Sequence, residues 1–176
     1  AGRPAGPPRE RRPRDDEREP PRPGLAPRAD EPATPEDVDV KSLPFAVRAE
    51  LRGLPTELAD IVGAHLVAAG ELIDVDPDLA YRHAEAAKRR AARLPIVREA
   101  LAETAYAAGE YAAALNEFRA LRRMSGADDY LAVMADCERA LGRHEAALKL
   151  IAEARRGDVD QLIQPLPQVL HVGGVD

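Results

Sequence analysis

The sequence predicts an all-α fold in which pairs of helices stack one upon another. Apolar side chains recur at helical spacing through residues 42–157, with short breaks between the segments. Two similar segments, GEYAAAL at 109–115 and GRHEAAL at 142–148, lie 33 residues apart. The chain is 45% apolar but only 3% aromatic. A core of mainly alanine and leucine favours closely packed helices, because small side chains let helix axes approach.

The first 41 residues differ in composition from the rest of the chain. They hold ten of the sixteen prolines, together with many arginines and acids, and almost no large apolar side chains. Such a segment cannot bury enough surface to offset the entropy lost on ordering. We therefore expect a disordered or extended arm over 1–41 and a helical domain over 42–157. A C-terminal tail follows over 158–176, where Pro165 and Pro167 stop any long helix.

Cap residues, prolines and glycines set the expected helix bounds. Ser42 caps a first helix that enters through Pro44, and Thr56 caps the second. Asp76 followed by Pro77 marks the start of the third helix, and a later proline breaks the chain after it. The expected helices, in order, cover residues 44–53, 56–72, 77–93, 97–108, 111–124, 129–141 and 144–156.

Self-similarity extends the pattern to a third copy. Ala114 and Ala147 occupy the same place in the two similar segments, and Ala80 lies 34 residues before Ala114. Each of the three stands near the start of a predicted helix. The repeat unit is therefore two helices every 33 to 34 residues, with a glycine in the turn of the last two copies.

A repeat of this length and content resembles the tetratricopeptide repeat. Six positions carry the resemblance in each of the last two copies, and a divergent first copy keeps only the small residues and lacks the turn glycine. These positions are Leu101, Ala102, Gly109, Tyr111, Ala114 and Phe118, then Met134, Ala135, Gly142, Ala147, Ile151 and Ala154, and Ala68, Ala80, Ala84 and Ala87 in the first copy. The resemblance implies an α-α superhelix of about three helical hairpins behind a leading helix. Residues 50–156 also look like a group of uncharacterised bacterial tetratricopeptide proteins with low-complexity N-termini.

Aligning the copies reveals basic residues at the ends of the three second helices, here called the basic ladder. Its members are Lys88, Arg89, Arg122, Arg123, Arg155 and Arg156. One interpretation is that cations in a last helical turn complement the negative end of the helix dipole, each contributing about 0.3–1 kcal/mol. The other is an edge that docks an acidic or phosphate-bearing partner.

In the tetratricopeptide family the concave groove is lined by the first helix of each pair. The resemblance therefore implies a groove formed by His65, Glu99, Glu103, Tyr106, Asp136 and Arg139. Because acids occupy several of these positions, such a groove would receive a basic or mixed-charge helix or peptide. The alternative is that these residues are simply solvated helix faces.

Other kinds of site chemistry find little support. The four histidines, at 65, 83, 144 and 171, do not have the spacing of metal ligands. His144 takes the place of Tyr111 in the next copy, and we expect it to pack there. Cys137 fits a small, half-buried residue better than a nucleophile. No glycine-rich phosphate loop is present. The sequence predicts no metal, no cofactor and no enzymatic activity.

The net charge of -6 gives no general attraction to nucleic acid or anionic membranes, and no apolar stretch reaches the roughly 18 residues that span a bilayer. The single cysteine favours a reducing compartment, so we expect a cytoplasmic protein. The leading hypothesis is a non-enzymatic scaffold or adaptor that holds a partner peptide or helix in its groove or on its basic edge. One alternative is binding of RNA or a ribonucleoprotein through the Arg-rich arm and Lys88, Arg122 and Arg155. Another is a self-associating structural module, so the sequence leaves both a monomer and an oligomer open.

Overall fold

The computed structural model describes residues 25–156, and every regular element within that range is helical. The all-α prediction is therefore confirmed for this part of the chain. A 3-10 turn precedes seven α-helices, all close to the expected bounds. In order, they are η1 (Val40–Ser42), α1 (Phe45–Leu51), α2 (Thr56–Leu72), α3 (Pro77–Ala91), α4 (Pro95–Ala107), α5 (Tyr111–Ser125), α6 (Leu131–Ala140) and α7 (His144–Ala154).

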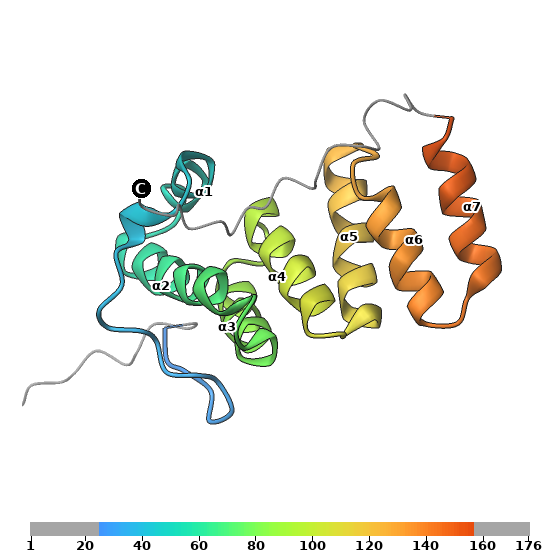
Figure 1. Cartoon of the computed structure of the whole chain (residues 1–176). Helices are drawn as coiled ribbons and strands as arrows, with labels where there is room; N and C mark the ends of the chain where they lie inside the picture. Colours follow the sequence, from blue (N-terminus) through green and yellow to red (C-terminus); the bar gives the residue numbers. More distant parts are fainter. Residues whose placement is uncertain (1–24, 157–176) are drawn as a thin grey trace, which may run out of the picture.

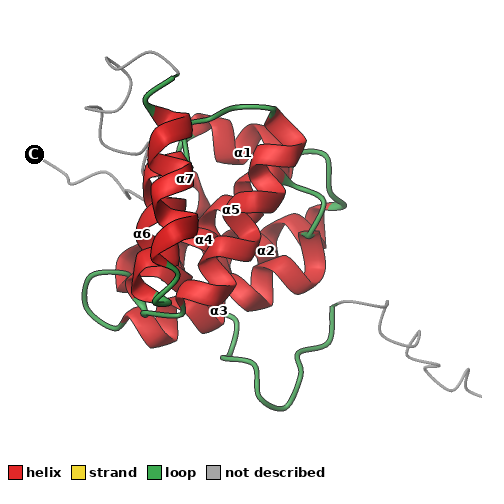
Figure 2. Cartoon of the chain, turned by 90° about the vertical axis from the view of Figure 1, so that its right-hand side faces the viewer, coloured by secondary structure: helices red, strands yellow, loops and turns green. Residues whose placement is uncertain are grey.

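The helices lie in a row that follows the order of the chain, from α1 and α2 at one end to α7 at the other (Figure 1). Each packs mainly against its neighbours in sequence, and a view along the row places α6 and α7 in front of the earlier helices (Figure 2). The buried apolar residues form two clusters, one around Leu66 and Val97 and one around Phe118 and Leu115. Tyr81 packs against both clusters and so joins the two halves of the row.

Small side chains set the spacing between the helices. Ala80, Ala114 and Ala147 are all buried, and each lies near the start of the second helix of its pair. Ala102 and Ala135 are buried at corresponding places on α4 and α6. A larger side chain at any of these points would push neighbouring helix axes apart. The alanines that recur in the sequence therefore mark recurring points of close helix packing.

The tight turns of the last two pairs are built alike. Gly109 and Gly142 adopt positive φ angles of 77° and 74°, a left-handed conformation that glycine adopts without steric cost. In each turn the amide of the residue after the glycine donates a hydrogen bond to a carbonyl in the last turn of the preceding helix. Glu110 donates to Ala105 and Arg143 donates to Glu138, both at 2.8 Å. The turn between α2 and α3 contains no glycine, as the divergent first copy predicts.

Of three predicted helix starts, one is confirmed and two differ by one or two residues. The Asp76 carboxylate accepts a hydrogen bond from the Leu79 amide at 3.1 Å, as predicted for the cap of α3. Thr56 is instead the first residue of α2 and not its cap. Helix α4 begins at Pro95 and not at residue 97, because a proline in first position lacks only an N–H that has no helical partner.

The predicted arm covers residues 1–41, yet residues 25–41 lie on the helical row. Val38 and Val40 pack against the core. Val40 lies so close to Gly63 that a β-carbon on Gly63 would be 2.7 Å from Val40 Cγ1. Glu31 forms ion pairs with α3. The folded part thus begins before the expected boundary at 42, since a few buried contacts outweigh the polar composition. Residues 1–24 and the tail expected over 158–176 lie outside the described residues.

Enlarging a buried alanine tests whether helix spacing depends on it. We expect Ala114→Leu to lower the free energy of unfolding by about 1–3 kcal/mol, because the added carbons have no space between α4 and α5. Ala112→Leu is the matched control, since Ala112 is exposed on the same helix and the change there should stay within about 0.5 kcal/mol. Urea unfolding followed by circular dichroism measures both, and equal effects would contradict the packing argument.

Candidate functional site

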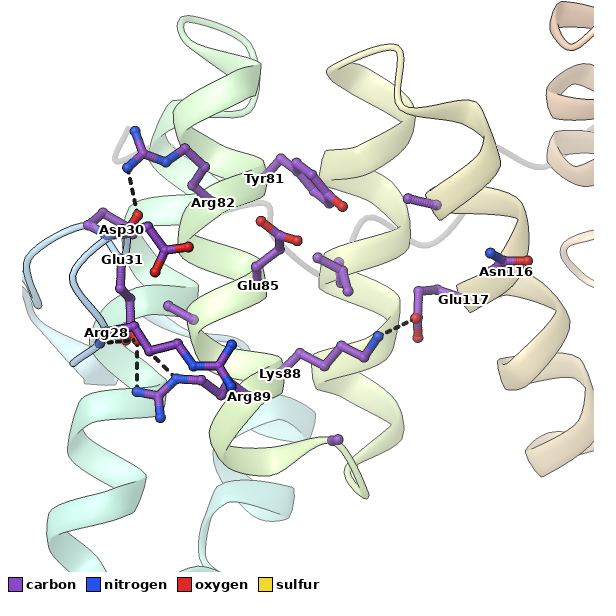
Figure 3. A pocket seen from close by; sticks show the side chains of 15 residues that line it. Arg28, Asp30, Glu31, Tyr81, Arg82, Glu85, Lys88, Arg89, Asn116 and Glu117 are labelled. Carbon is purple, nitrogen blue, oxygen red and sulfur yellow. Dashed lines mark hydrogen bonds and ion pairs between the residues drawn. The ribbon is translucent and has the colours of Figure 1, made fainter. Parts of the chain in front are cut away.

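An open cleft lies between the N-terminal segment, α3 and α5, and is here called the α3–α5 cleft (Figure 3). Its volume is about 770 Å³. Charges of both signs and a few apolar groups line it, among them Arg28 and Asp30 from the segment, Tyr81, Glu85 and Lys88 from α3, and Asn116 from α5. The cleft is therefore suited to a segment that carries both positive and negative side chains.

Helix α3 presents one apolar and one charged face, as its spacing dictates. Ala80, Ala84, Ala87 and Ala91 point into the core and are buried. The charged positions between them are left to face the cleft and the N-terminal segment. This arrangement makes α3 the wall that positions most of the cleft's polar groups.

A buried carboxylate fixes the other side of the cleft. Glu117 on α5 accepts hydrogen bonds from Lys88 Nζ at 2.5 Å and from Arg98 Nη1 at 2.7 Å, and Figure 3 shows Lys88 reaching across to it. An unpaired carboxylate at this depth would be strongly destabilising. Because its two cations come from α3 and α4, Glu117 ties three helices together at the edge of the cleft.

The basic ladder lies where the repeats place it, near the C-terminal ends of α3, α5 and α7. Half of its members join parts of the chain: Lys88 pairs with Glu117, Arg89 with Glu31, and Arg122 with Asp128 and Glu153. Arg123, Arg155 and Arg156 are exposed. The ladder is therefore not a continuous cationic edge. Three of its members form ion pairs within the chain, and the other three are solvated arginines.

Two tyrosine–carboxylate hydrogen bonds connect the groove residues that the sequence predicts. The Tyr106 hydroxyl donates to Asp136 Oδ2 at 2.6 Å, and Arg139 Nη2 donates to Asp136 Oδ1 at 2.5 Å. The Tyr130 hydroxyl donates to Glu99 Oε1, also at 2.6 Å. The structure thus brings Tyr106, Asp136 and Arg139 together and turns Glu99 toward Tyr130. Glu103, one turn further along α4, is half-buried.

These contacts and burial shift the pKa values of the groove residues. The hydrogen bond to Asp136 raises the pKa of Tyr106 to about 12, and the same bond is the main reason the pKa of Asp136 is lowered. Burial raises the pKa of Glu99. His65, which the resemblance places in this groove, is instead fully buried between α2 and α3. His144, expected to pack as Tyr111 does, is exposed because no described segment covers that part of α7.

A buried polar cluster adjoins the cleft under residues 25–35. The two histidine rings face each other, with Nδ1 of His65 2.9 Å from Nδ1 of His83. One ring must donate a proton and the other must accept it, so the accepting ring is neutral in this arrangement. Nε2 of His65 lies 3.3 Å from the Thr34 hydroxyl and 3.7 Å from Glu31 Oε1.

The charges around this cluster are held by burial and by ion pairs. Burial, followed by the field of His83 and Arg90, lowers the pKa of His65 to about 4. Burial likewise lowers the pKa of His83. Burial alone would raise the pKa of Glu31, but hydrogen bonds from the Arg28 amide and from Arg90 and Arg89 outweigh it and lower the value. Glu31 is therefore ionised beside two neutral histidines at neutral pH.

Sequence reasoning missed this cluster, although one signal pointed to half of it. His65 and His83 each lie nine residues from Asp74, in the turn between α2 and α3. An antiparallel helix pair brings positions equidistant from its turn together. No such signal exists for Glu31, which is 58 residues from Arg89 in the chain. Within residues 25–156, no three histidine, cysteine or acidic side chains form a group that could hold a metal ion.

Comparison of the chain with protein-family models, with curated proteins and with solved structures finds no match. Among the helices of residues 25–156, none is both long enough and apolar enough to cross a lipid bilayer.

The histidine pair should make stability depend on pH. Unfolded His65 titrates near 6.5, whereas the folded pKa is about 4, so unfolding takes up a proton between these values. The contribution is complete above pH 6.5 and is lost as the pH falls toward 4, by on the order of 2–3 kcal/mol. Urea unfolding at pH 7.5, 6 and 5 measures this loss.

His65→Gln should flatten this pH dependence, and His144→Gln should preserve it because His144 is exposed. Glu31 contributes at lower pH, because its pKa lies below the ordinary carboxyl value. An unchanged slope in His65→Gln would contradict the assignment.

Proposed function

We propose that the chain is a tetratricopeptide-like scaffold that holds a mixed-charge segment of a protein partner in the α3–α5 cleft. The proposal narrows the scaffold hypothesis drawn from the sequence and moves its main contact from the predicted groove to this cleft. The observation that carries it is that the cleft is already bordered by a non-helical segment, residues 25–35, bound through side chains of α3.

The repeat geometry supports the tetratricopeptide-like part of the proposal. Helix pairs follow one another with the 33 to 34 residue period, and the glycine turns after α4 and α6 close with the same hydrogen bond. Alanines at matching positions are buried in all three pairs. Repeats of this kind contact mainly their neighbours and form extended binding surfaces, which is consistent with the row in Figure 1.

The charges of the cleft support a peptide over a nucleic acid. Glu85 and Asp30 stand beside Lys88 and Arg82, so a polyphosphate would meet carboxylates as well as cations. Of the ladder cations that the RNA alternative names, Lys88 and Arg122 are already paired with carboxylates, whereas Arg155 is exposed.

The one cysteine favours a packing role over catalysis. Cys137 is buried, and burial raises the pKa of its thiol to about 11, which disfavours the nucleophilic thiolate.

A second candidate function, self-association, is favoured by the outer face of α7. Leu148 and Ile151 are 66% and 40% exposed there, and a groove of about 310 Å³ between α6 and α7 is lined largely by alanine and Ile151. Exposed apolar surface of this kind is typical of interfaces.

A cross-linking experiment tests the cleft. We expect a photoreactive amino acid at position 116 to form an adduct with one partner protein, because Asn116 lines the cleft and is exposed. Glu85→Lys should abolish the adduct by reversing a charge of the cleft. Glu145→Lys makes the same change on α7, away from the cleft, and should preserve it. Mass spectrometry identifies the partner and the linked segment, and a yield insensitive to Glu85→Lys would overturn the proposal.

Sedimentation at several concentrations tests the second candidate. If α7 mediates self-association, the wild-type chain should grow in average mass with concentration, and Ile151→Lys should keep it monomeric because a charge on the apolar face opposes burial. Ala152→Lys, an exposed neighbour on the same helix, is the control. A wild-type chain that stays monomeric throughout excludes this candidate.

A further inference from the structure

Residues 25–35 cross α2 and α3 without helix or strand, and their hold on the helices is mainly polar. Residues 26–30 are all exposed, whereas the Glu31 side chain is only 5% exposed. In Figure 1 this segment is the blue loop beside α2 and α3. A segment attached by one buried carboxylate and a few hydrogen bonds behaves like a bound peptide more than like part of a hydrophobic core.

The site that receives Glu31 is made by two consecutive arginines of α3. Glu31 Oε2 accepts a hydrogen bond from Arg89 Nε at 2.9 Å and forms an ion pair with Arg89 Nη2 at 2.7 Å. Glu31 Oε1 accepts from Arg90 Nη1, and the Arg90 side chain is fully buried. Each carboxylate oxygen is therefore held by a different guanidinium, through charge-assisted hydrogen bonds that are stronger than neutral ones. Arg89 and Arg90 are here called the carboxylate receptor.

The arginines of α3 also hold the main chain of the segment. Arg82 Nη2 donates to the Asp30 carbonyl and Arg89 Nη2 to the Ala26 carbonyl, both at 2.9 Å. Arg90 Nη2 lies 3.5 Å from the Leu25 carbonyl. Every peptide carries such carbonyls, so these contacts recognise a main chain that turns between Arg28 and Glu31 and not a particular sequence. Together with the receptor they recognise a peptide turn that bears one carboxylate.

The receptor has a donor that the segment does not use. Arg90 Nε is buried and has no hydrogen-bond partner among the described residues. A buried N–H without an acceptor is unfavourable, so residues 25–35 do not saturate the site. A peptide with one more acceptor at this point would make a hydrogen bond that the chain's own segment does not.

We propose that Arg82, Arg89 and Arg90 form a binding site for an acidic peptide segment of a partner protein, and that residues 25–35 are an internal ligand competing for it. The inference rests on the proposed function, because Glu31 and Arg89 also line the α3–α5 cleft. Displacement of the segment opens the cleft toward α2. Tethering gives the internal ligand an effective concentration in the millimolar range, so an acidic partner binds weakly until the segment is released.

The test uses the full chain and a labelled peptide with the sequence of residues 25–37. Wild-type chain should bind it weakly, because its own segment fills the receptor. Glu31→Gln frees the receptor, and the labelled peptide should then bind at least about tenfold more tightly. Glu36→Gln is the matched control, since Glu36 is exposed in the same region, and it should behave as wild type.

A second peptide, carrying Glu31→Gln, should bind none of the three chains. Fluorescence anisotropy measures all combinations. If a folded Glu31→Gln chain binds neither peptide, or binds both equally, residues 25–35 are a fixed part of the fold and the inference is overturned.

A second measurement covers a Glu31→Gln chain that does not fold. In an isotope-labelled wild-type chain, the Arg28 amide donates to Glu31 at 3.1 Å and should exchange slowly with solvent. Excess unlabelled peptide 25–37 should speed this exchange, whereas the Gln-containing peptide should not. Exchange that is indifferent to the acidic peptide overturns the inference. Binding of the added peptide does not depend on cross-linking from position 116. Failure of the peptide experiment therefore overturns this inference alone, and failure of the cross-linking experiment overturns the proposed function alone.

Discussion

The structure depends on one constraint: each helix pair can bury its apolar stripe only against the next pair. The alanines at 80, 114 and 147 satisfy it, since they let the second helix of each pair approach its neighbours without leaving a void. The order of the row follows from the same constraint, because each helix packs mainly on those adjacent in sequence. A cleft forms on the outer side of α3 and α5, where side chains become large and charged.

Buried carboxylates add selectivity to this packing. Glu31, Glu117 and Glu138 have little exposed side chain, and each is held by two cations: Arg89 with Arg90, Lys88 with Arg98, and Arg119 with Arg143. A buried ion pair adds little net stability, because the cost of removing both charges from water offsets their attraction. Loss of one partner is nevertheless costly, because the other charge is left buried and unpaired. They therefore favour a single arrangement of the row. At Glu117 and Glu138 the carboxylate comes from a helix, whereas at Glu31 it comes from a segment with no regular structure.

The sequence predicts what is local and repeated. Helix bounds, the Asp76 cap and the two glycine turns follow from propensity and spacing, and the buried alanines follow from the period. Gly63 illustrates the opposite case: a glycine inside a helix looks unfavourable until Val40 is seen to occupy the space of its missing side chain. Glu31 likewise has no local signal, because a single charged residue in a proline-rich segment does not indicate which helix receives it. The exposure of His144 depends on what lies beyond α7, and no pattern within the helix reveals that.

An internal ligand changes what affinity means for this row of helices. If the segment occupies the carboxylate receptor 99% of the time, a partner's apparent affinity is about a hundredfold weaker than its intrinsic one. Any event that releases the segment removes that factor without altering a contact to the partner. Protonating His65 beneath the segment would act in two opposed ways, since the new cation is repelled by Arg90 and attracted to Glu31 Oε1, 3.7 Å from Nε2. The buried polar cluster is thus the anchor of residues 25–35.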